Sequence, residues 1–193
     1  MSRKAKRAAG DVPQHRRGDS MKMKNEMKAF LRWLAKYHTD FHVEPGMPEL
    51  LLKTGGLWFK GRADSDEYAD AKRWKKKHKP KAQDCFYNSQ QFCMQYHGSR
   101  YFEGFVLSKK GLGAEEHAWV VMQDGRVVDF TMEAVEAVLT KKRHAMDLSG
   151  ALYFGLEVPK EFIVETIMET GWYDCIAELF YVDQIQRIAF SKR

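Results

Sequence analysis

The sequence predicts an α+β fold: a cysteine-bearing helix packed on a small antiparallel sheet, with additional N- and C-terminal helices. Three observations predict it. Apolar residues in the first half of the chain recur at every third or fourth position, as in amphipathic helices. From Tyr101 onward the apolar runs become short, aromatic and rich in valine, as in strands. An Asp124-Gly125 pair separates two of these runs and favours a tight hairpin turn.

The first half of the chain reads as helices joined by turns. An amphipathic helix is expected over Met21–Tyr37, a turn at Pro45, and a short helical piece over Glu49–Lys53 that ends in a Gly-Gly loop. Acidic residues at positions 64–67 suit the N-cap and first turn of a further helix, which continues to about Lys77. Pro80 ends that helix.

The cysteine-bearing helix is expected over residues 84–96, with Gly98 just past its end. Strands are predicted at 101–107, 117–122, 126–130 and 151–158, and helices at 132–140 and 159–170. Strands 117–122 and 126–130 should form a hairpin across Gln123-Asp124-Gly125. Residues 172–190 alternate too ambiguously to choose between helix and strand. Residues 21–193 are expected to form one domain, since 193 residues can bury one sizeable core.

The positive charge is concentrated at the N-terminus. Residues 1–28 hold nine Lys and Arg against three Asp and Glu, which accounts for the whole net charge of +6. Residues 1–20 contain almost no large apolar side chains, so they are expected to form a disordered basic tail.

The cysteines and the apolar runs indicate in which cellular compartment the protein is expected. Cys85, Cys93 and Cys175 include no CxxC pair, which disfavours a zinc ribbon. Cys85 and Cys93 lie about 12 Å apart along a helix, too far for a disulfide. Free thiols fit a reducing compartment. No apolar run is long enough for a membrane span, and the N-terminus lacks the apolar middle of a secretory signal. A cytoplasmic protein without membrane contact is therefore expected.

Cys85, His117 and Asp129 follow the order needed by a thiol nucleophile, its base and the residue that orients the base. Cys85 occupies the first turn of its helix, where the helix dipole favours the thiolate. His117 begins a strand and Asp129 ends the partner strand. Counted outward from the turn, His117 pairs with residue 131 in tight register, or with Asp129 if the turn holds one more residue. Each residue taken alone has a structural interpretation, as a buried thiol, a hydrogen-bonded histidine or a strand-end carboxylate.

The same residues carry a family resemblance. His117-Ala118-Trp119-Val120-Val121, the Asp124-Gly125 turn and Val127-Val128-Asp129-Phe130-Thr131 resemble the histidine and aspartate strands of transglutaminase-like and papain-like cysteine enzymes. The blocks at Cys85–Ser89 and Tyr101–Gly104 are similar to small proteins of this type encoded by tailed bacteriophages. The resemblance covers about residues 83–131. It implies Cys85 as nucleophile, His117 as base and Asp129 as orienter, and the host cytoplasm as the compartment if the chain is phage-encoded.

Further residues are candidates for the walls of a cleft. The backbone N–H of Cys85 would serve an oxyanion hole, with Gln83 as the side-chain candidate and Trp74 behind it. Trp119 shares the strand face of His117. Glu103 is either a carboxylate in the wall of the site or a solvated strand residue.

The function expected is amide or ester hydrolysis, deamidation or transglutaminase-like transfer through a thioester, with a protein or peptide amide as substrate and no cofactor or metal. The alternative is a binding protein of the same fold that holds nucleic acid or an acidic protein. Its basic candidates are Lys72, Arg73, Lys75, Lys76, Lys77, Lys79 and Lys81, with Trp74 placed to stack on a base. The simpler interpretation of this run is a solvated helix end.

A third interpretation is metal binding. His38 and His42 are four residues apart, with Asp40 and Glu44 close by. No third ligand is evident, so a surface pair is expected.

Overall fold

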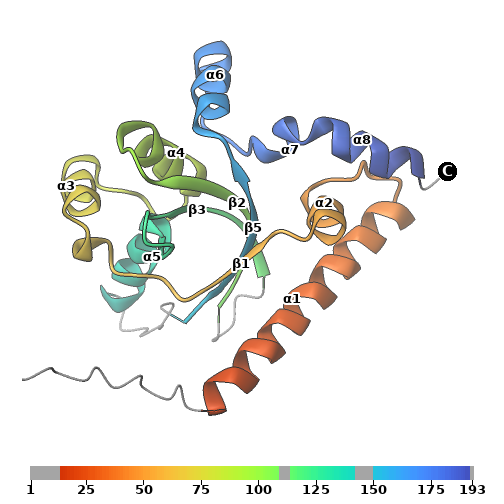
Figure 1. Cartoon of the computed structure of the whole chain (residues 1–193), viewed down its shortest axis with the longest axis horizontal. Coiled ribbons are helices and arrows are strands. Elements are labelled where there is room, and N and C mark those ends of the chain that lie inside the picture. Colours follow the sequence, from red (N-terminus) through yellow and green to blue (C-terminus); the bar gives the residue numbers. More distant parts are fainter. Residues whose placement is uncertain (1–13, 109–113, 142–149, 192–193) are drawn as a thin grey trace, which may run out of the picture.

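The chain adopts the predicted α+β fold in a computed structural model that describes residues 14–108, 114–141 and 150–191 (Figure 1). One five-stranded antiparallel sheet curls through the centre of the molecule, and helices surround it. The predicted cysteine-bearing helix and the N- and C-terminal helices are all present, so the predicted fold class is confirmed.

The N-terminal helix is longer than expected. Helix α1 spans Gln14–Asp40, whereas the sequence predicted disorder up to residue 20 and a helix only from Met21. Gln14, Arg16 and Arg17 are residue types of good helix propensity, which favours continuing the helix N-terminally. Residues 1–13 of the expected tail lie outside the described residues. Helix α2, Met47–Thr54, carries Pro48 in its first turn and is capped at its end by Gly55, whose φ of 74° lies in the left-handed region.

The segment between α2 and the cysteine-bearing helix contains a strand that the sequence did not reveal. Strand β1, Leu57–Lys60, follows the Gly-Gly loop. The acidic residues predicted to start a helix instead form a short 3₁₀ turn, η1, over Ser65–Glu67, capped by the Asp64 side chain. Helix α3 then spans Ala69–His78 and ends before Pro80, as expected.

The central elements match the predicted order. Helix α4 spans Cys85–Gln95, and strand β2 spans Arg100–Leu107. Strand β3 covers Ala114–Val121 and so begins three residues before His117. Strand β4 is only Val127–Val128, because Asp129 ends the strand and helix α5, Phe130–Lys141, starts at once.

The C-terminal third contains one strand followed by helices. Strand β5, Leu152–Val158, leads through Pro159 into helix α6, Lys160–Thr170, which ends at Gly171. The ambiguous C-terminal region is helical, as α7, Ala177–Phe180, and α8, Val182–Ser191. Among the helices of the described segments, none has the length and apolarity that crossing a bilayer requires.

The strands are ordered β1-β5-β2-β3-β4, so the chain's first strand pairs with its last. The predicted hairpin of β3 and β4 is confirmed. Val120 pairs with Val128 and Val121 with Val127. The turn closes through a hydrogen bond from the Gly125 N–H to the Met122 carbonyl, and Gly125 takes a φ of 83°.

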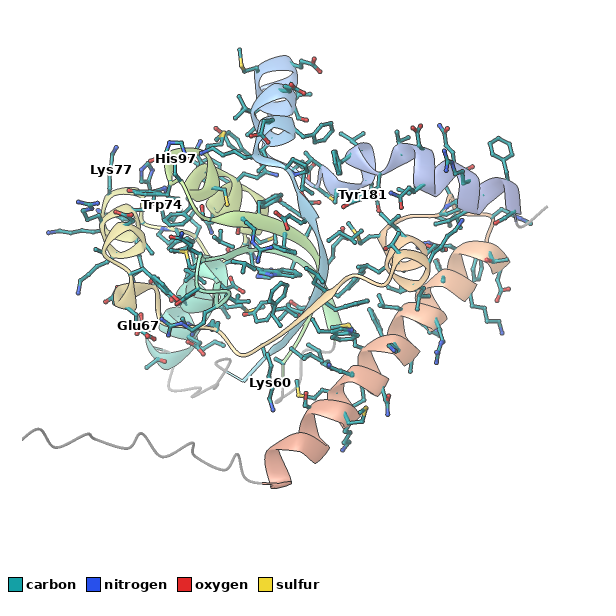
Figure 2. The ribbon with its side chains drawn as sticks, in the orientation of Figure 1. Lys60, Glu67, Trp74, Lys77, His97 and Tyr181 are labelled. Atoms are coloured by element: carbon teal, nitrogen blue, oxygen red, sulfur yellow. The ribbon has the colours of Figure 1, made fainter. Side chains whose placement is uncertain are left out.

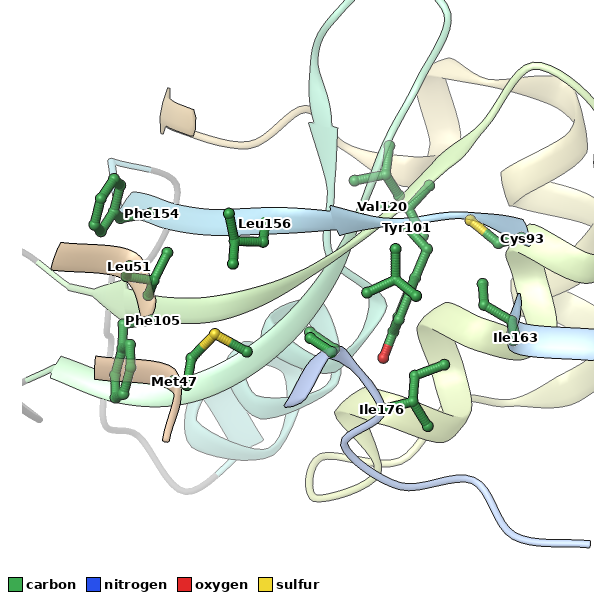
Figure 3. Close-up of a cluster of buried hydrophobic side chains, with 14 of the residues drawn as sticks. Met47, Leu51, Cys93, Tyr101, Phe105, Val120, Phe154, Leu156, Ile163 and Ile176 are labelled. Atoms are coloured by element: carbon green, nitrogen blue, oxygen red, sulfur yellow. The ribbon is translucent and has the colours of Figure 1, made fainter. Parts of the chain in front are cut away.

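The two faces of the sheet bury separate clusters. One face carries Tyr101, Phe105, Val120, Phe154 and Leu156 against apolar residues of α1, α2, α4, α6 and α8 (Figure 3). The opposite face carries Phe102, Val106, Trp119, Val121 and Tyr153 against Met132 of α5 and Phe59 of β1. Because alternate strand residues point to opposite faces, His117 and Asp129 belong to the side of Trp119 and Val127.

Candidate active site

Cys85 is the first residue of α4 and is partly buried. Asp84 occupies the N-cap position but makes no side-chain capping hydrogen bond, and its carboxylate instead lies 3.6 Å from the Lys81 ammonium. Cys85 therefore stands at the N-terminal end of α4, where the helix dipole is positive.

Two buried hydrogen bonds fix the face of α4 that carries Cys85. The Asn88 side-chain amide donates to the Thr131 hydroxyl at 2.8 Å, and the Ser89 hydroxyl donates to the Ala118 carbonyl at 3.1 Å. Asn88 and Ser89 lie three and four residues after Cys85, so the three side chains share one helix face. That face is held against β3 beside His117 and against the start of α5 beside Asp129.

His117 and Asp129 meet in the interior. The His117 Nε2 atom lies 2.8 Å from Oδ2 of Asp129, and the two residues are 5% and 0% exposed. Continuing the register of β3 and β4 by one step sets Asp129 opposite Trp119, one diagonal position from His117 on the same face. Of the two registers left open by the sequence, the structure has the tight one.

Besides His117, three hydrogen-bond donors hold the Asp129 carboxylate. Its Oδ1 atom accepts from the backbone N–H groups of Thr131 and Met132 at 3.1 and 2.9 Å, as an N-cap of α5 does. Its Oδ2 atom accepts from the Tyr153 hydroxyl at 3.0 Å as well as from the imidazole. One carboxylate thus caps a helix with one oxygen and orients a histidine with the other.

The charges of the pair reinforce each other. Burial lowers the pKa of His117, but the charge and hydrogen bond of Asp129, together with the hydrogen bond and charge of Cys85, raise it to about 10. Burial raises the pKa of Asp129, and the His117 charge, the helix N–H groups and Tyr153 outweigh burial and lower it. The site therefore favours the charged forms of both partners, an imidazolium on His117 and a carboxylate on Asp129.

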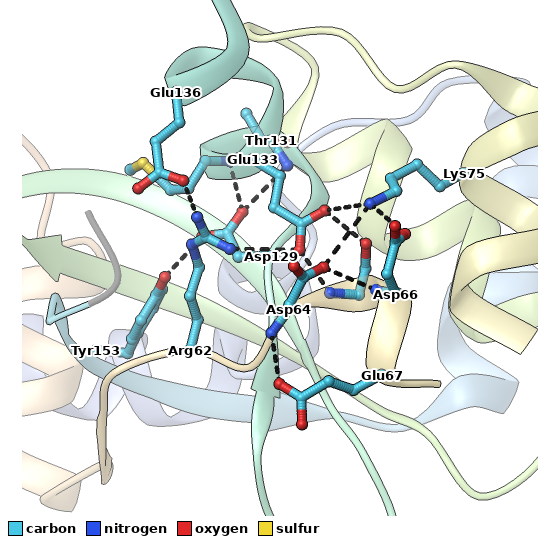
Figure 4. Close-up of polar contacts among 12 residues, drawn as sticks. Arg62, Asp64, Asp66, Glu67, Lys75, Asp129, Thr131, Glu133, Glu136 and Tyr153 are labelled. Atoms are coloured by element: carbon cyan, nitrogen blue, oxygen red, sulfur yellow. Dashed lines mark hydrogen bonds and ion pairs between the residues drawn. The ribbon is translucent and has the colours of Figure 1, made fainter. Parts of the chain in front are cut away.

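A network of ion pairs behind Asp129 fixes the first turn of α5 (Figure 4). Glu133 accepts from the Arg62 guanidinium at 3.3 Å, from the Ser65 N–H at 2.7 Å and from the Lys75 ammonium at 3.2 Å. Arg62 also pairs with Glu136. Lys75, expected to contact a partner, is instead part of this network, because α3 packs beside η1 and α5.

Trp74 and Trp119 are not exposed cleft residues. Trp74 is 1% exposed, stacks on His78 and packs against Phe92 and Phe130. The prediction that Trp74 stacks on a base is therefore wrong, because this large aromatic on the inner side of α3 fills the core. Trp119 is 0% exposed, on the face of His117. Gln83 is exposed, close before Cys85 in the chain.

Glu103 is neither a wall of the site nor solvated. It pairs with Ala118 and so points to the face opposite His117, where it is 0% exposed. Its carboxylate accepts from the Tyr101 hydroxyl at 2.6 Å and from the N–H groups of Ile176 and Ala177 at 3.0 and 2.8 Å. Burial raises its pKa. Glu103 therefore anchors the start of α7 to the sheet.

The other basic candidates lie on the outer side of α3 and in the loop after it. Figure 2 shows Lys77 directed outward and Trp74 directed inward. Arg73 pairs with Asp70, and Lys81 with Asp84. The exposed members without a recorded ion pair among the described residues are Lys72, Lys76, Lys77 and Lys79.

His38 and His42, the pair considered for metal binding, have different surroundings. Nδ1 of His38 lies 3.2 Å from Oε2 of the buried Glu49, so His38 links α1 to α2. His42 is exposed, with a φ of 55°. In the segments that the structure describes, no three His, Cys, Asp or Glu side chains are grouped to hold a metal ion.

Sequence reasoning missed three contributors to the site: Asn88, Ser89 and Tyr153. The sequence did contain a pattern that points to Asn88 and Ser89. Both are polar and lie three and four residues after Cys85, on the helix face that must be buried, so they need buried hydrogen-bond partners. Tyr153 gave no such signal, because its contact with Asp129 spans 24 residues.

No protein-family model matches the chain, and neither a curated protein nor a solved structure gives a match. The case for a function consequently depends on the residues themselves.

Proposed function

We propose that the chain is a cysteine-dependent acyl-transfer enzyme in which Cys85 is the nucleophile, His117 the general base and Asp129 the residue that orients His117. The buried contact of 2.8 Å between His117 and Asp129 carries the proposal, and Cys85 interacts with the same imidazole. Because Asp129 holds Nε2, the Nδ1 atom remains for the thiol.

The reaction begins when His117 takes the Cys85 proton and the thiolate attacks an amide or ester carbonyl carbon. A C–S bond forms, and the carbonyl electrons move to oxygen. Collapse of this intermediate breaks the C–N or C–O bond, and His117 returns its proton to the leaving amine or alcohol. Water then attacks the thioester, with His117 accepting its proton, and the C–S bond breaks to restore the thiol.

The side chains of this chain suffice for these steps. The substrate class we propose is a protein or peptide amide. Hydrolysis is preferred over transfer to an amine, because no residues in the described part of the chain indicate a binding site for an acceptor amine. Deamidation and transglutaminase-like transfer use the same thioester. All three cysteines are free, which supports a reducing compartment such as the cytoplasm.

Acylation by p-nitrophenyl acetate tests the nucleophile. The wild type should release a burst of nitrophenolate and carry one acetyl group on Cys85, located by mass spectrometry of peptides. Cys85→Ala should show neither, and Cys93→Ala, which removes a buried thiol of the same helix, should keep both. Acetylation spread over all cysteines, or absent from Cys85, would contradict the proposal.

A binding protein without turnover is the second candidate. The exposed cations Lys72, Lys76, Lys77 and Lys79 favour it, since they leave α3 with a positive outer surface. Salt-sensitive binding of nucleic acid or an acidic protein that persists in Cys85→Ala and falls in a triple Lys72, Lys76, Lys77→Gln variant would support this candidate.

A further inference from the structure

Helix α1 exposes a row of aromatic side chains along its outer side. Trp33, Tyr37 and Phe41, each four residues from the next, are 59%, 44% and 65% exposed. The helix lies along the outside of the molecule, and only its inner side, with Met27 and Leu31, contributes to the core (Figure 1). Large exposed aromatics in a contiguous row indicate an interaction surface.

A row of cations runs beside the aromatic row. Lys28, Arg32 and Lys36 are exposed and also four residues apart. Lys36 lies three residues after Trp33, so the two rows are neighbours on the helix surface. Among the ion pairs of the described segments, none involves these three cations, and α1 holds no acidic residue between Met27 and Thr39.

Neighbouring rings of the aromatic row lie close together with moderately inclined planes. The ring centroids of Trp33 and Tyr37 are 6.1 Å apart with planes inclined by 30°, and those of Tyr37 and Phe41 are 4.6 Å apart with planes inclined by 36°. The cation row and the aromatic row therefore run side by side, and successive members of each row are separated by four residues, about 6 Å of helix rise. Proteins that bind single-stranded nucleic acid combine the same two elements: cations for phosphates and aromatic faces for bases.

We propose that the outer side of α1 binds single-stranded nucleic acid, with Lys28, Arg32 and Lys36 on the phosphates and Trp33, Tyr37 and Phe41 stacked on bases. Charge favours this partner over a second copy of the chain. A two-fold contact between α1 helices would bring the cation rows of both copies together. The net charge of +6 resides wholly in residues 1–28, so the sequence leading into this row is basic as well.

The test measures the binding of a fluorescein-labelled oligothymidine by fluorescence anisotropy at several salt concentrations. The oligothymidine has about 20 nucleotides, more than one single-strand binding site occupies. Trp33→Ala should weaken binding about tenfold, whereas Trp33→Phe, which keeps a ring, should retain most of the affinity. The triple Lys28, Arg32, Lys36→Gln variant should reduce the slope of log affinity against log salt by about 2.

The triple Lys72, Lys76, Lys77→Gln variant removes the same charge from α3, the surface of the second candidate, and so distinguishes the two surfaces. If α1 is the binding surface, this variant should change affinity less than about twofold. Circular dichroism verifies that each variant is folded. Absence of binding, or loss of binding in the α3 variant with the α1 variants unaffected, would overturn the proposal. So would dimerisation in analytical ultracentrifugation that Trp33→Ala abolishes. Cys85→Ala should bind like the wild type, so this result is independent of the proposed catalysis.

Discussion

The Nε2 atom of His117 lies 2.8 Å from the Oδ2 atom of Asp129, in a place where both side chains are buried. The contact is diagonal across the β3–β4 pair, and the carboxylate is simultaneously the N-cap of α5. Its position is thus set by a hairpin, a helix start and the Tyr153 hydroxyl of β5. A contact fixed from three directions holds the imidazole in one orientation, as a general base requires.

Replacing Asp129 by Asn should abolish most of the reactivity of Cys85. The amide oxygen can still accept from the first turn of α5, but the negative charge facing His117 is lost. We expect the alkylation rate of Cys85 by iodoacetamide at about neutral pH to fall at least about 100-fold, measured by mass spectrometry of the Cys85 peptide.

Tyr153→Phe is the matched control, because it removes one donor to the same Oδ2 atom and leaves the charge in place. Its effect on the alkylation rate should be only a few-fold. If Asp129→Asn reacts as fast as the wild type, or no slower than Tyr153→Phe, Asp129 does not orient the base.

Stability should depend on pH through the same pair. The pKa of His117 is raised to about 10, so its contribution to the free energy of unfolding is fully present below the unfolded value of about 6.5 and is lost as the pH rises towards 10. The pKa of Asp129 is lowered, so its contribution is present above about 3.9 and is lost at lower pH.

Urea unfolding of the wild type and His117→Gln should therefore differ by a few kcal/mol near pH 5 to 6, and the difference should shrink towards pH 9. His97→Gln, at an exposed position, controls for the removal of an imidazole. A difference between wild type and His117→Gln that stays constant from about pH 6 to 9 would show that the ion pair does not form.

The sequence predicted those features that depend on neighbouring residues. The Asp124-Gly125 pair predicted the β3–β4 hairpin because a tight turn needs the positive φ that Gly125 adopts. The start of α4 and its end near Gly98 were predicted for similar local reasons. The register of the hairpin could not be chosen, because both turn lengths place apolar residues on the inner face.

Features that depend on distant partners were not predictable. Strand β1 exists because residues Leu57–Lys60 pair with β5, almost a hundred residues later in the chain. The charge on Glu103 suggested solvent or a site, but its partners are the backbone groups of Ile176 and Ala177. For the candidate site, the contact of His117 with Asp129 could be predicted, whereas the attachment of α4 to β3 and α5 required the structure.

That attachment can be tested by Asn88→Ala and Ser89→Ala. Each change leaves a buried partner without its hydrogen bond, the Thr131 hydroxyl in one case and the Ala118 carbonyl in the other. We expect each variant to lose about 1–3 kcal/mol of unfolding free energy. Cys85 alkylation should also slow, because the helix face that carries the thiol is released.

Thr170→Ala serves as the comparison, since its hydroxyl donates to the Thr166 carbonyl at the end of α6, in a partly buried position. It should lower stability by less and leave Cys85 alkylation unchanged. Should Asn88→Ala and Ser89→Ala unfold more easily yet keep the wild-type alkylation rate, the two hydrogen bonds stabilise the fold without positioning Cys85.

Gly155 lies in the centre of β5. A Cβ atom there would lie 2.3 Å from the Glu103 carbonyl oxygen and 2.4 Å from the ring of Trp119. Trp119 is buried two residues after His117, so Gly155→Ala should displace β3 at the site. Overpacking of this kind costs about 1–3 kcal/mol, and we expect the melting temperature to fall by about 2–12 °C. Gly171→Ala is the control: its φ of 71° makes alanine unfavourable, but no heavy atom lies within 4 Å. Calorimetry should show a smaller shift for Gly171→Ala, with Cys85 alkylation unchanged. Equal shifts for the two variants would mean that β5 yields to the added methyl group and that Trp119 does not transmit the strain to His117.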